Sequence, residues 1–234
     1  MNPFLTALSF LTIIKIDPKT YDIKNSPYFF PAVGFIIGIP LFFILKSDIY
    51  LKELLSIAYL VVITGALHLD GLSDTCDGIF SHKDRLQKLE IMKDSRIGVM
   101  GCVCIVLIIL IKYELFKITA PSFVPVALFF GRFTGITFMA SLPYARVNGT
   151  AKSFEAFNIL SKNRNIIYLI ASFLLILLVL NFITFLAIFI LSIFISYFFS
   201  KLFFKILGGY TGDTVGAVIE VSEVLILYIL ICIY

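Results

Sequence analysis

Three aspartates recur at spacings of four and three residues, at Asp70, Asp74 and Asp77. If the second apolar segment continues as a helix through Asp77, Asp74 lies about 40° from Asp70 around the helix axis and Asp77 about 20° on the other side. Three like charges on one face repel one another, and acids beside an apolar span are costly. A bound divalent cation relieves both costs. The spacing therefore predicts a metal site that holds a phosphate group.

Asp94 precedes the third apolar segment and can complete this metal site from a facing helix. Oxygen ligands alone favour Mg²⁺, with Mn²⁺ as a second choice, over zinc. His68 lies two residues before the first aspartate and can orient a ligand or accept a proton near neutral pH. Two plainer interpretations stay open. The acids can form a solvated helix end, and the histidine can pair with a backbone group or an acid.

A diphosphate ligand also needs positive donors, and arginine offers a bidentate fork for phosphate oxygens. Arg96 follows Asp94 by two residues, Arg132 interrupts the fourth apolar segment, and Arg146 lies in the loop after that segment. We predict that all three arginines contact the substrate. The alternatives are a structural pair between Arg132 and an intramembrane acid, and an ordinary cytoplasmic loop anchor at Arg146.

A glycine-rich stretch precedes the last apolar segment and carries Gly209, Thr211 and Asp213. Its glycines can open backbone N–H groups to an anion, or they can allow close helix packing. We predict substrate contacts from these three residues. Glu220 and Glu223 follow, and their spacing of three makes them neighbours on a helix face.

Strongly apolar segments carry these residues. The 234-residue chain is 60% apolar and 15% charged, with a mean hydropathy of +1.02, whereas about a quarter of the residues of a soluble domain are charged. We predict an all-α, polytopic integral membrane helix bundle that forms a single domain over residues 1–234. Crossing the lipid bilayer takes roughly 20 apolar residues. About seven predicted transmembrane helices cover residues 29–45, 53–70, 97–116, 121–142, 164–180, 182–200 and 216–234, with a turn near Asn181.

Positive charges divide unequally between the two sides of these spans. With seven spans, 14 of the 19 lysines and arginines lie in loops on one side, and four, including Lys112, lie on the other. Positive loops stay in the cytoplasm, so we predict a multi-pass protein of the cell (plasma or inner) membrane with its active site on the cytoplasmic side. The apolar stretch 1–14 lacks a basic region, and we expect an interfacial or re-entrant helix there.

Composition excludes two other features. The net charge is only +4, and no basic tract suits nucleic acid, so we expect no nucleic-acid partner. The cysteines show no disulfide framework, and three of the four lie in apolar segments as small buried residues. They are Cys76, Cys102, Cys104 and Cys232.

Taken together, these motifs resemble the cobalamin synthase family, the adenosylcobinamide-GDP ribazoletransferases. The similarity covers most of the chain, and the three-aspartate run followed by the Lys93-to-Gly98 run is highly specific. One departure is the stretch 148–151, where a more glycine-rich sequence is expected. The resemblance rests on Phe10-Leu11-Thr12, Tyr28-Phe29-Phe30-Pro31, His68-Leu69-Asp70-Gly71 through Asp77-Gly78, Glu90-Ile91-Met92-Lys93-Asp94-Ser95-Arg96-Ile97-Gly98, Tyr144-Ala145-Arg146 and Gly208-Gly209-Tyr210-Thr211-Gly212-Asp213-Thr214.

The resemblance implies an Mg²⁺-dependent membrane enzyme. An α-ribazole, free or 5′-phosphorylated, attacks the corrinoid-linked phosphoryl group of adenosylcobinamide-GDP, GMP leaves, and the lower nucleotide loop of the cobamide is complete. A carboxylate or His68 takes the proton of the ribose hydroxyl. The predicted residues are, for catalysis, His68, Asp74, Asp94 and Arg96; for substrate binding, Lys93, Arg132, Arg146, Gly209, Thr211 and Asp213; and for metal binding, Asp70, Asp74, Asp77 and Asp94.

Two other functions fit part of the pattern. A membrane phosphotransferase of the CDP-alcohol type needs an Asp-Gly-x-x-Ala-Arg motif, but Asp70 and Gly71 are not followed by Ala-Arg here. A cation transporter would place acids at mid-membrane depth in several spans and would not need Arg96 and Arg146. The position of the acids at the edge of a segment favours the enzyme.

Overall fold

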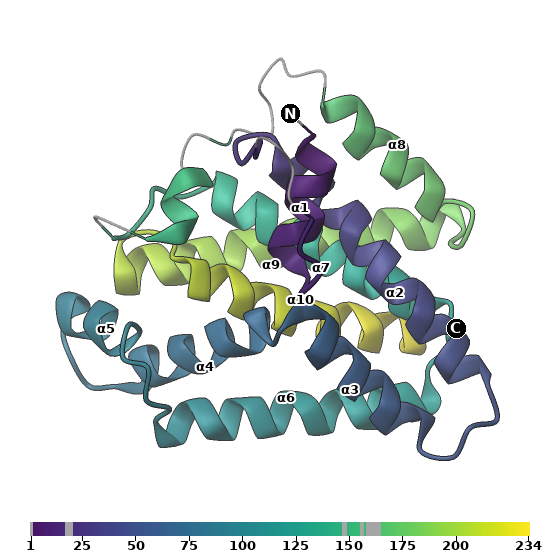
Figure 1. The fold of residues 1–234 in the computed structure, drawn as a ribbon, viewed down its shortest axis with the longest axis horizontal. Helices are drawn as coiled ribbons and strands as arrows, with labels where there is room; N and C mark the ends of the chain where they lie inside the picture. The colour runs from purple at the N-terminus through teal and green to yellow at the C-terminus, as the bar shows by residue number, and fades with distance from the viewer. Residues whose placement is uncertain (1, 17–20, 147–148, 155–156, 158–164) are drawn as a thin grey trace.

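Helices form most of the described part of the protein, as a computed structural model shows (Figure 1). It describes residues 2–16, 21–146, 149–154, 157 and 165–234. Across these ranges no β-strand occurs, which confirms the all-α prediction. The elements are α1 (Pro3–Leu11), η1 (Ser26–Phe29), α2 (Phe30–Lys46), α3 (Lys52–Thr64), α4 (Leu67–Phe80), α5 (Arg85–Ile91), α6 (Val99–Ile118), α7 (Phe123–Ala140), η2 (Thr150–Phe154), α8 (Ile166–Ile176), α9 (Phe182–Leu207) and α10 (Gly212–Ile233), where η marks a 3₁₀ helix.

Five helical segments are long and apolar enough to cross a membrane: η1 with α2, α6, α7, α9 and α10. The pair α3 and α4 adds a sixth if both helices form one broken span. The polytopic membrane bundle is therefore confirmed, but seven spans is too many for the part of the chain described. The predicted span 164–180 yields only α8, with 11 residues. That helix rises about 17 Å, well short of a hydrocarbon core of about 30 Å.

The connections gather alternately at the two ends of the bundle (Figure 1). One end carries α5 and the first turns of α6 and α10, whereas the other carries the α2–α3 loop, the α6–α7 connection and the C-terminus. The predicted turn at Asn181 is confirmed, because its side chain accepts the Thr184 N–H and starts α9. The same side chain donates to the Tyr234 hydroxyl at 2.7 Å, which ties this turn to the chain end.

The N-terminal stretch forms a short helix, as predicted. Asn2 caps α1 by accepting the N–H groups of Phe4 and Leu5, and α1 packs against η1 and α2. The Ile13 N–H donates to the Ile63 carbonyl at 2.8 Å and so joins the segment after α1 to the end of α3. Its placement at the membrane interface stays a prediction.

A sharp break separates α3 from α4, so the predicted continuous helix from residue 53 through Asp77 is wrong. The two helices meet at 87°, and Gly65 and Ala66 both adopt left-handed backbones with φ of 57° and 56°. Glycine takes this conformation without steric cost, whereas alanine takes it at some cost. The three aspartates still share one helix, because all lie on α4. The break places the start of α4 midway along the bundle (Figure 1).

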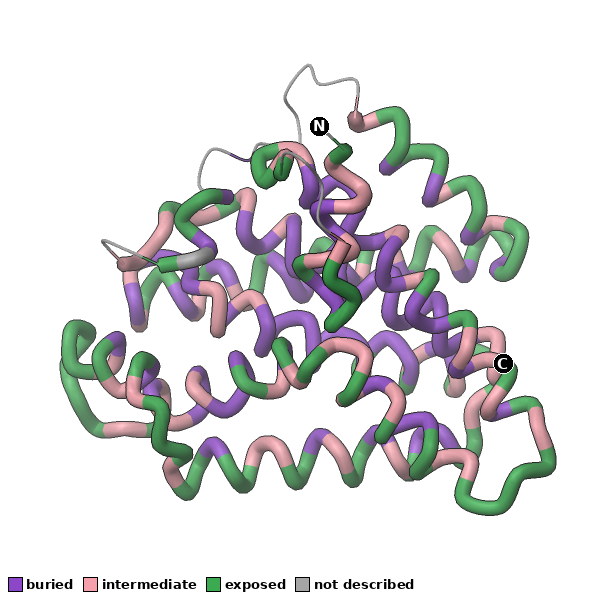
Figure 2. Tube along the Cα trace, viewed as in Figure 1, coloured by how far each residue is buried: buried purple, intermediate pink, exposed green. Residues whose placement is uncertain are grey.

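α7 is the most enclosed of the long helices (Figure 2). Of its most apolar stretch, 89% is buried, against 28% for α6 and for α9. Glycines bring its neighbours close: a Cβ added at Gly38 of α2 would lie 2.8 Å from the Pro125 Cβ, and one at Gly135 would lie 2.6 Å from Ile219 Cγ1 of α10. Such close packing gives α10 a defined position relative to α2 and α7.

Gly71 sets the distance between α4 and α10, and Gly71→Ala is expected to destabilise the protein. An added Cβ would lie 2.8 Å from the Asp213 carbonyl oxygen and 3.0 Å from its Cα, and backbone atoms cannot move aside as a side-chain end can. Overpacking of this kind costs about 1–3 kcal/mol. Thermal unfolding in detergent measures the loss. Gly212→Ala is the control, because its Cβ meets only the Ala151 Cβ at 3.5 Å; equal midpoints for the two variants would contradict the prediction.

Candidate functional site

Three carboxylates and one guanidinium meet where α4 packs against the start of α10. Asp70 and Asp74 lie on α4, and Asp213 lies in the first turn of α10. Arg146 Nη2 is 2.7 Å from Asp213 Oδ2. The charges of Asp213, Asp70 and Arg146 all act on the Asp74 carboxylate. One positive charge faces three negative ones, so the cluster favours an additional cation.

Backbone hydrogen bonds bring Arg146 to Asp213. The Ala145 N–H donates to the Tyr210 carbonyl at 2.8 Å, and the Tyr210 N–H donates to the Pro143 carbonyl at 3.0 Å. The loop after α7 and the loop before α10 therefore run side by side, in an isolated parallel bridge. The bridge therefore brings Arg146, two residues after it on one loop, beside Asp213, three residues after it on the other.

The glycine-rich loop has structural tasks that the sequence left open. Gly209 has no room for a side chain, because a Cβ would run into the Pro143 carbonyl. Thr211 caps α10, since its hydroxyl accepts the Thr214 N–H and its own N–H donates to the Thr214 hydroxyl. Thr211 is fully buried. Of the three predicted residues in this loop, Asp213 is the one that joins the carboxylate cluster, and substrate contacts from Gly209 and Thr211 stay predictions.

A pocket of about 100 Å³ opens beside the carboxylates. Asp70, Asp213 and His68 line it, with Phe10 of α1 and Phe154 of η2 on its wall. His68 is buried, and its Nδ1 has no hydrogen-bond partner among the described residues. Buried polar groups are nearly always satisfied. Because His68 also lines the pocket, a ligand that enters there can supply a hydrogen-bond partner to its imidazole.

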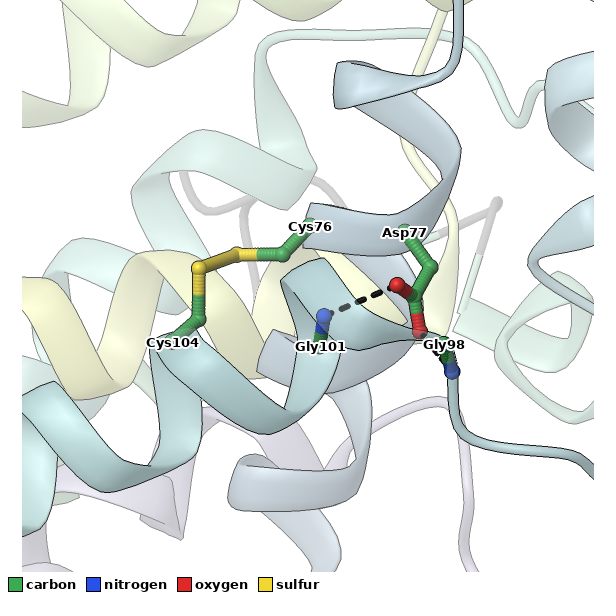
Figure 3. Close-up of a disulfide and its surroundings, with 5 residues drawn as sticks. All are labelled: Cys76, Asp77, Gly98, Gly101 and Cys104. Atoms are coloured by element: carbon green, nitrogen blue, oxygen red, sulfur yellow. Dashed lines mark hydrogen bonds between the residues drawn. A yellow bond between two sulfur atoms is a disulfide. The ribbon is translucent and has the colours of Figure 1, made fainter.

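Asp77 faces the start of α6 (Figure 3). Its two carboxylate oxygens accept the Gly98 N–H at 2.7 Å and the Gly101 N–H at 2.8 Å. These N–H groups lie in the first turn of α6, where a helix leaves donors unsatisfied and favours negative charge. Asp77 therefore caps α6 from a different helix. The sequence does not reveal this role, because capping motifs are recognised only when the capping residue lies within a few positions of the helix start.

Asp77→Ala is expected to lower the free energy of unfolding by about 1 kcal/mol, as the loss of a helix cap does. Asp77→Asn keeps one carbonyl acceptor and should retain part of that stability. The midpoints of thermal unfolding, measured under reducing conditions so that no disulfide holds α4 to α6, rank the two variants. A wild-type midpoint in Asp77→Ala would rule out the cap.

A disulfide joins Cys76 and Cys104 beside this cap (Figure 3). It connects α4 to α6, with the two Cα atoms 6.7 Å apart. The expectation of no disulfide is wrong for this pair, since a separation of 28 residues carries no signal until the helices pack together. Cys102 and Cys232 are free and exposed, so the expectation that they are buried is also corrected.

Lys93, Asp94 and Arg96 form an exposed group beside the start of α6. Arg96 Nη2 is 2.6 Å from Asp94 Oδ2, and Lys93 Nζ is 2.7 Å from Glu90 Oε1. Hydrogen bonds from Arg96 lower the pKa of Asp94 to about 2, so this carboxylate is charged throughout the neutral range. A pocket of about 390 Å³ is lined by Asp77, Asp94 and Arg96. Exposed ion pairs are weak, so these partners are free to exchange for a phosphate.

The four predicted metal ligands do not converge on one point. Within the described residues, no group of three His, Cys, Asp or Glu side chains is placed to hold a metal ion. Asp77 faces α6 and Asp94 pairs with Arg96. Asp70 and Asp74 remain one helical turn apart beside the pocket. Two carboxylates with substrate phosphates and water are the ligand set that Mg²⁺ commonly takes, so this pair fits the predicted ion.

A buried network of four charged side chains lies deeper in the bundle. Lys112 Nζ is 2.6 Å from Glu220 Oε2 and 2.7 Å from Glu223 Oε2, and Arg132 Nη1 pairs with Glu223 Oε1. All four side chains are buried, and their charges balance. The structure therefore forms the structural pair that was the alternative for Arg132, which does not line the pocket beside Asp70. Lys112 is likewise buried within the bundle and is not the loop residue that the sequence predicts.

Known proteins resemble this chain over its full length. Residues 3–231 match the family described as cobalamin-5-phosphate synthase. Similar proteins from Fusobacterium nucleatum, Clostridium botulinum and Acinetobacter baumannii, each named adenosylcobinamide-GDP ribazoletransferase, are 35%, 33% and 34% identical to it. The alignments cover 100%, 99% and 100% of this chain and 98% of each relative. No solved structure matches the chain. By motif, fold and similarity, the chain belongs to the cobalamin-5-phosphate synthase family.

Proposed function

We propose that this protein completes the nucleotide loop of a cobamide by joining adenosylcobinamide-GDP to α-ribazole or α-ribazole 5′-phosphate. A ribose oxygen of the acceptor forms a bond to the corrinoid-linked phosphorus, and the bridging P–O bond of the diphosphate breaks. GMP leaves with the bridging oxygen, and the hydroxyl proton passes to a base on the enzyme. The family and the names of its relatives support this reaction.

The cluster of Asp70, Asp74, Asp213 and Arg146 is the observation that carries the proposal. Its members come from α4, from the loop after α7 and from the start of α10, and all three segments contain motifs of the family resemblance. A pocket with buried His68 opens onto the cluster. Acids with an arginine beside a pocket suit phosphoryl transfer, in which positioning and charge stabilisation supply most of the catalysis.

The chain's own residues divide between phosphate binding and proton transfer. Arg146 is already positioned by its pair with Asp213, and its fork matches phosphate oxygens. Arg96 and Lys93 can turn from their exposed partners to the leaving GMP phosphate. The base is His68 or one of the carboxylates, of which Asp74 is central to the cluster.

Asp70 and Asp74 are the residues that would hold Mg²⁺, with Mn²⁺ as a substitute. When bound, such an ion neutralises charge on the diphosphate as the phosphoryl bond breaks. The oxygen donors on one helical face support this assignment, because a hard cation prefers carboxylate oxygens. The proposed ligands are this pair alone, because Asp77 and Asp94 already have protein donors.

Release of GMP tests the proposal. Purified protein in detergent with adenosylcobinamide-GDP, α-ribazole phosphate and Mg²⁺ should release GMP in step with formation of the cobamide. Chelation by EDTA should stop the reaction, and added Mg²⁺ should restore it. Absence of GMP from a folded preparation would refute the function, whereas turnover that survives EDTA would refute only the metal.

We further propose that the site faces the cytoplasm from the cell membrane. Lys83, Lys93 and Arg96 lie in the two loops beside α5, at the end of the bundle that also carries the start of α10, and positive loops on this end support the cytoplasmic side. Labelling of a cysteine introduced at His82, with an impermeant reagent in intact cells and in inverted vesicles, decides the orientation. Labelling in intact cells would overturn it.

A further inference from the structure

A second, larger pocket lies on the other side of Phe10 and Phe154. Its volume is about 680 Å³, compared with about 100 Å³ for the pocket beside Asp70. Both phenylalanines line both pockets, with ring centroids 5.2 Å apart in an edge-to-face arrangement. A ligand in the larger pocket is therefore separated from Asp70 and Asp213 by a single aromatic wall. Volumes in this range are typical of sites for small organic ligands.

Three hydroxyl groups that line the larger pocket are already bonded to the backbone, and the other two lining hydroxyls belong to the exposed residues Tyr21 and Ser153. The hydroxyl of Thr6 donates to the Asn2 carbonyl at 3.1 Å, and that of Ser9 donates to the Ile16 carbonyl at 3.0 Å. The hydroxyl of Ser26 donates to Ile23 O at 2.9 Å. A ligand that needs many hydrogen bonds would find few donors to spare. The pocket instead suits a flat group with few polar atoms.

The remaining lining supplies ring faces and one charge. Tyr21 is half exposed, so its ring is open to a ligand, and Phe10 is 39% exposed. Aromatic faces stack on heterocyclic bases with little dependence on the base's polar edge. Lys15 is exposed and is the charged residue among the described residues that line the pocket. An ammonium at the rim favours a phosphate there.

We propose that this pocket binds the azole base of α-ribazole, with Lys15 at the 5′-phosphate of its phosphorylated form. The inference rests on the proposed function, for which it names the acceptor subsite. Guanine is the competing base, but its amide and amino edge requires partners that the bonded hydroxyls of Thr6, Ser9 and Ser26 do not provide. The aromatic wall places the bound acceptor next to the carboxylates.

Steady-state kinetics of a Tyr21 pair test the stacking. Tyr21→Ala should raise the KM for α-ribazole about tenfold, the loss expected for one stacked base, and leave the KM for adenosylcobinamide-GDP unchanged. Tyr21→Phe keeps the ring and should behave as wild type. A rise in the KM for adenosylcobinamide-GDP instead would assign the pocket to the other substrate and overturn the inference.

Lys15→Ala tests the charge at the rim. It should raise the KM for α-ribazole 5′-phosphate several-fold and leave that for unphosphorylated α-ribazole unchanged, so the ratio of the two constants is the readout. Lys24→Ala is the matched control, since Lys24 is an exposed lysine of the same segment that does not line the pocket. Equal changes for both acceptors in Lys15→Ala would contradict the assignment.

Direct binding separates the subsite from the reaction. Benzimidazole and guanine are dialysed against the full-length protein in nanodiscs without the second substrate. Benzimidazole should bind and guanine should not, and Ser153→Trp, which fills the pocket, should abolish binding while Ser153→Ala retains it. Benzimidazole binding that persists in Ser153→Trp would overturn the subsite. So would a lack of benzimidazole binding to the wild-type protein in nanodiscs, because lipid would then occupy the pocket. Absence of GMP release in the wild type would instead overturn the proposed function.

Discussion

Asp74→Asn is expected to reduce GMP release by about 10³-fold, within the range for removal of a catalytic carboxylate, without unfolding the protein. Asp74 lies within the acidic cluster, where we propose that it serves as an Mg²⁺ ligand or as the base. Asparagine keeps the shape of the side chain but supplies neither the charge nor a proton acceptor. The comparison is the initial rate of GMP release at saturating substrates, for variant and wild type.

Unfolding behaviour distinguishes this loss from a folding defect. The charges of Asp70 and Asp213 act on Asp74, so removing its charge relieves repulsion, and the thermal midpoint should stay the same or rise. Asp48→Asn is the matched control, because Asp48 is exposed in the α2–α3 loop at the opposite end of the bundle. Turnover in Asp74→Asn equal to that of Asp48→Asn would refute the role of Asp74.

Glu223→Ala is expected to destabilise the protein by about 3–5 kcal/mol, the cost of breaking a buried ion pair by removing one partner. Glu223 is buried and contacts both Lys112 and Arg132. Without it, two buried positive charges share the single carboxylate of Glu220, and charge within a membrane span is expensive. Thermal unfolding in detergent and the yield of folded protein both report this loss.

An exposed glutamate of the same kind supplies the control. Glu114 forms an ion pair with Lys117 at 2.9 Å, but both side chains are largely exposed. Glu114→Ala should leave the unfolding midpoint nearly unchanged, because solvent screens such pairs. Similar losses in Glu114→Ala and Glu223→Ala would show that burial does not set the cost and would contradict the prediction.

The residues of the site were predictable, but their assignments were not all correct. Helix spacing predicts Asp70 and Asp74 as metal ligands, and residue type predicts Arg146 and Asp213 as substrate contacts; the structure brings the four together. The predicted metal ligands include Asp77 because it shares the helix face of Asp70 and Asp74, yet the end of α4 that carries Asp77 packs against the start of α6, whose N–H groups it accepts. Helix periodicity gives a direction around an axis and does not say which neighbour lies there.

The sequence by itself determined the membrane helix bundle, the family and the types of residue at the site. These follow from apolar content, from helix period and from motifs of adjacent residues, all of which are local properties of the chain. The tertiary structure decided the α3–α4 break at Gly65, the pairing of Arg132 with Glu223 and the cap on α6. Each of these depends on contacts between distant segments, because a buried charge or an open helix end is stabilised by whichever partner packing brings within reach.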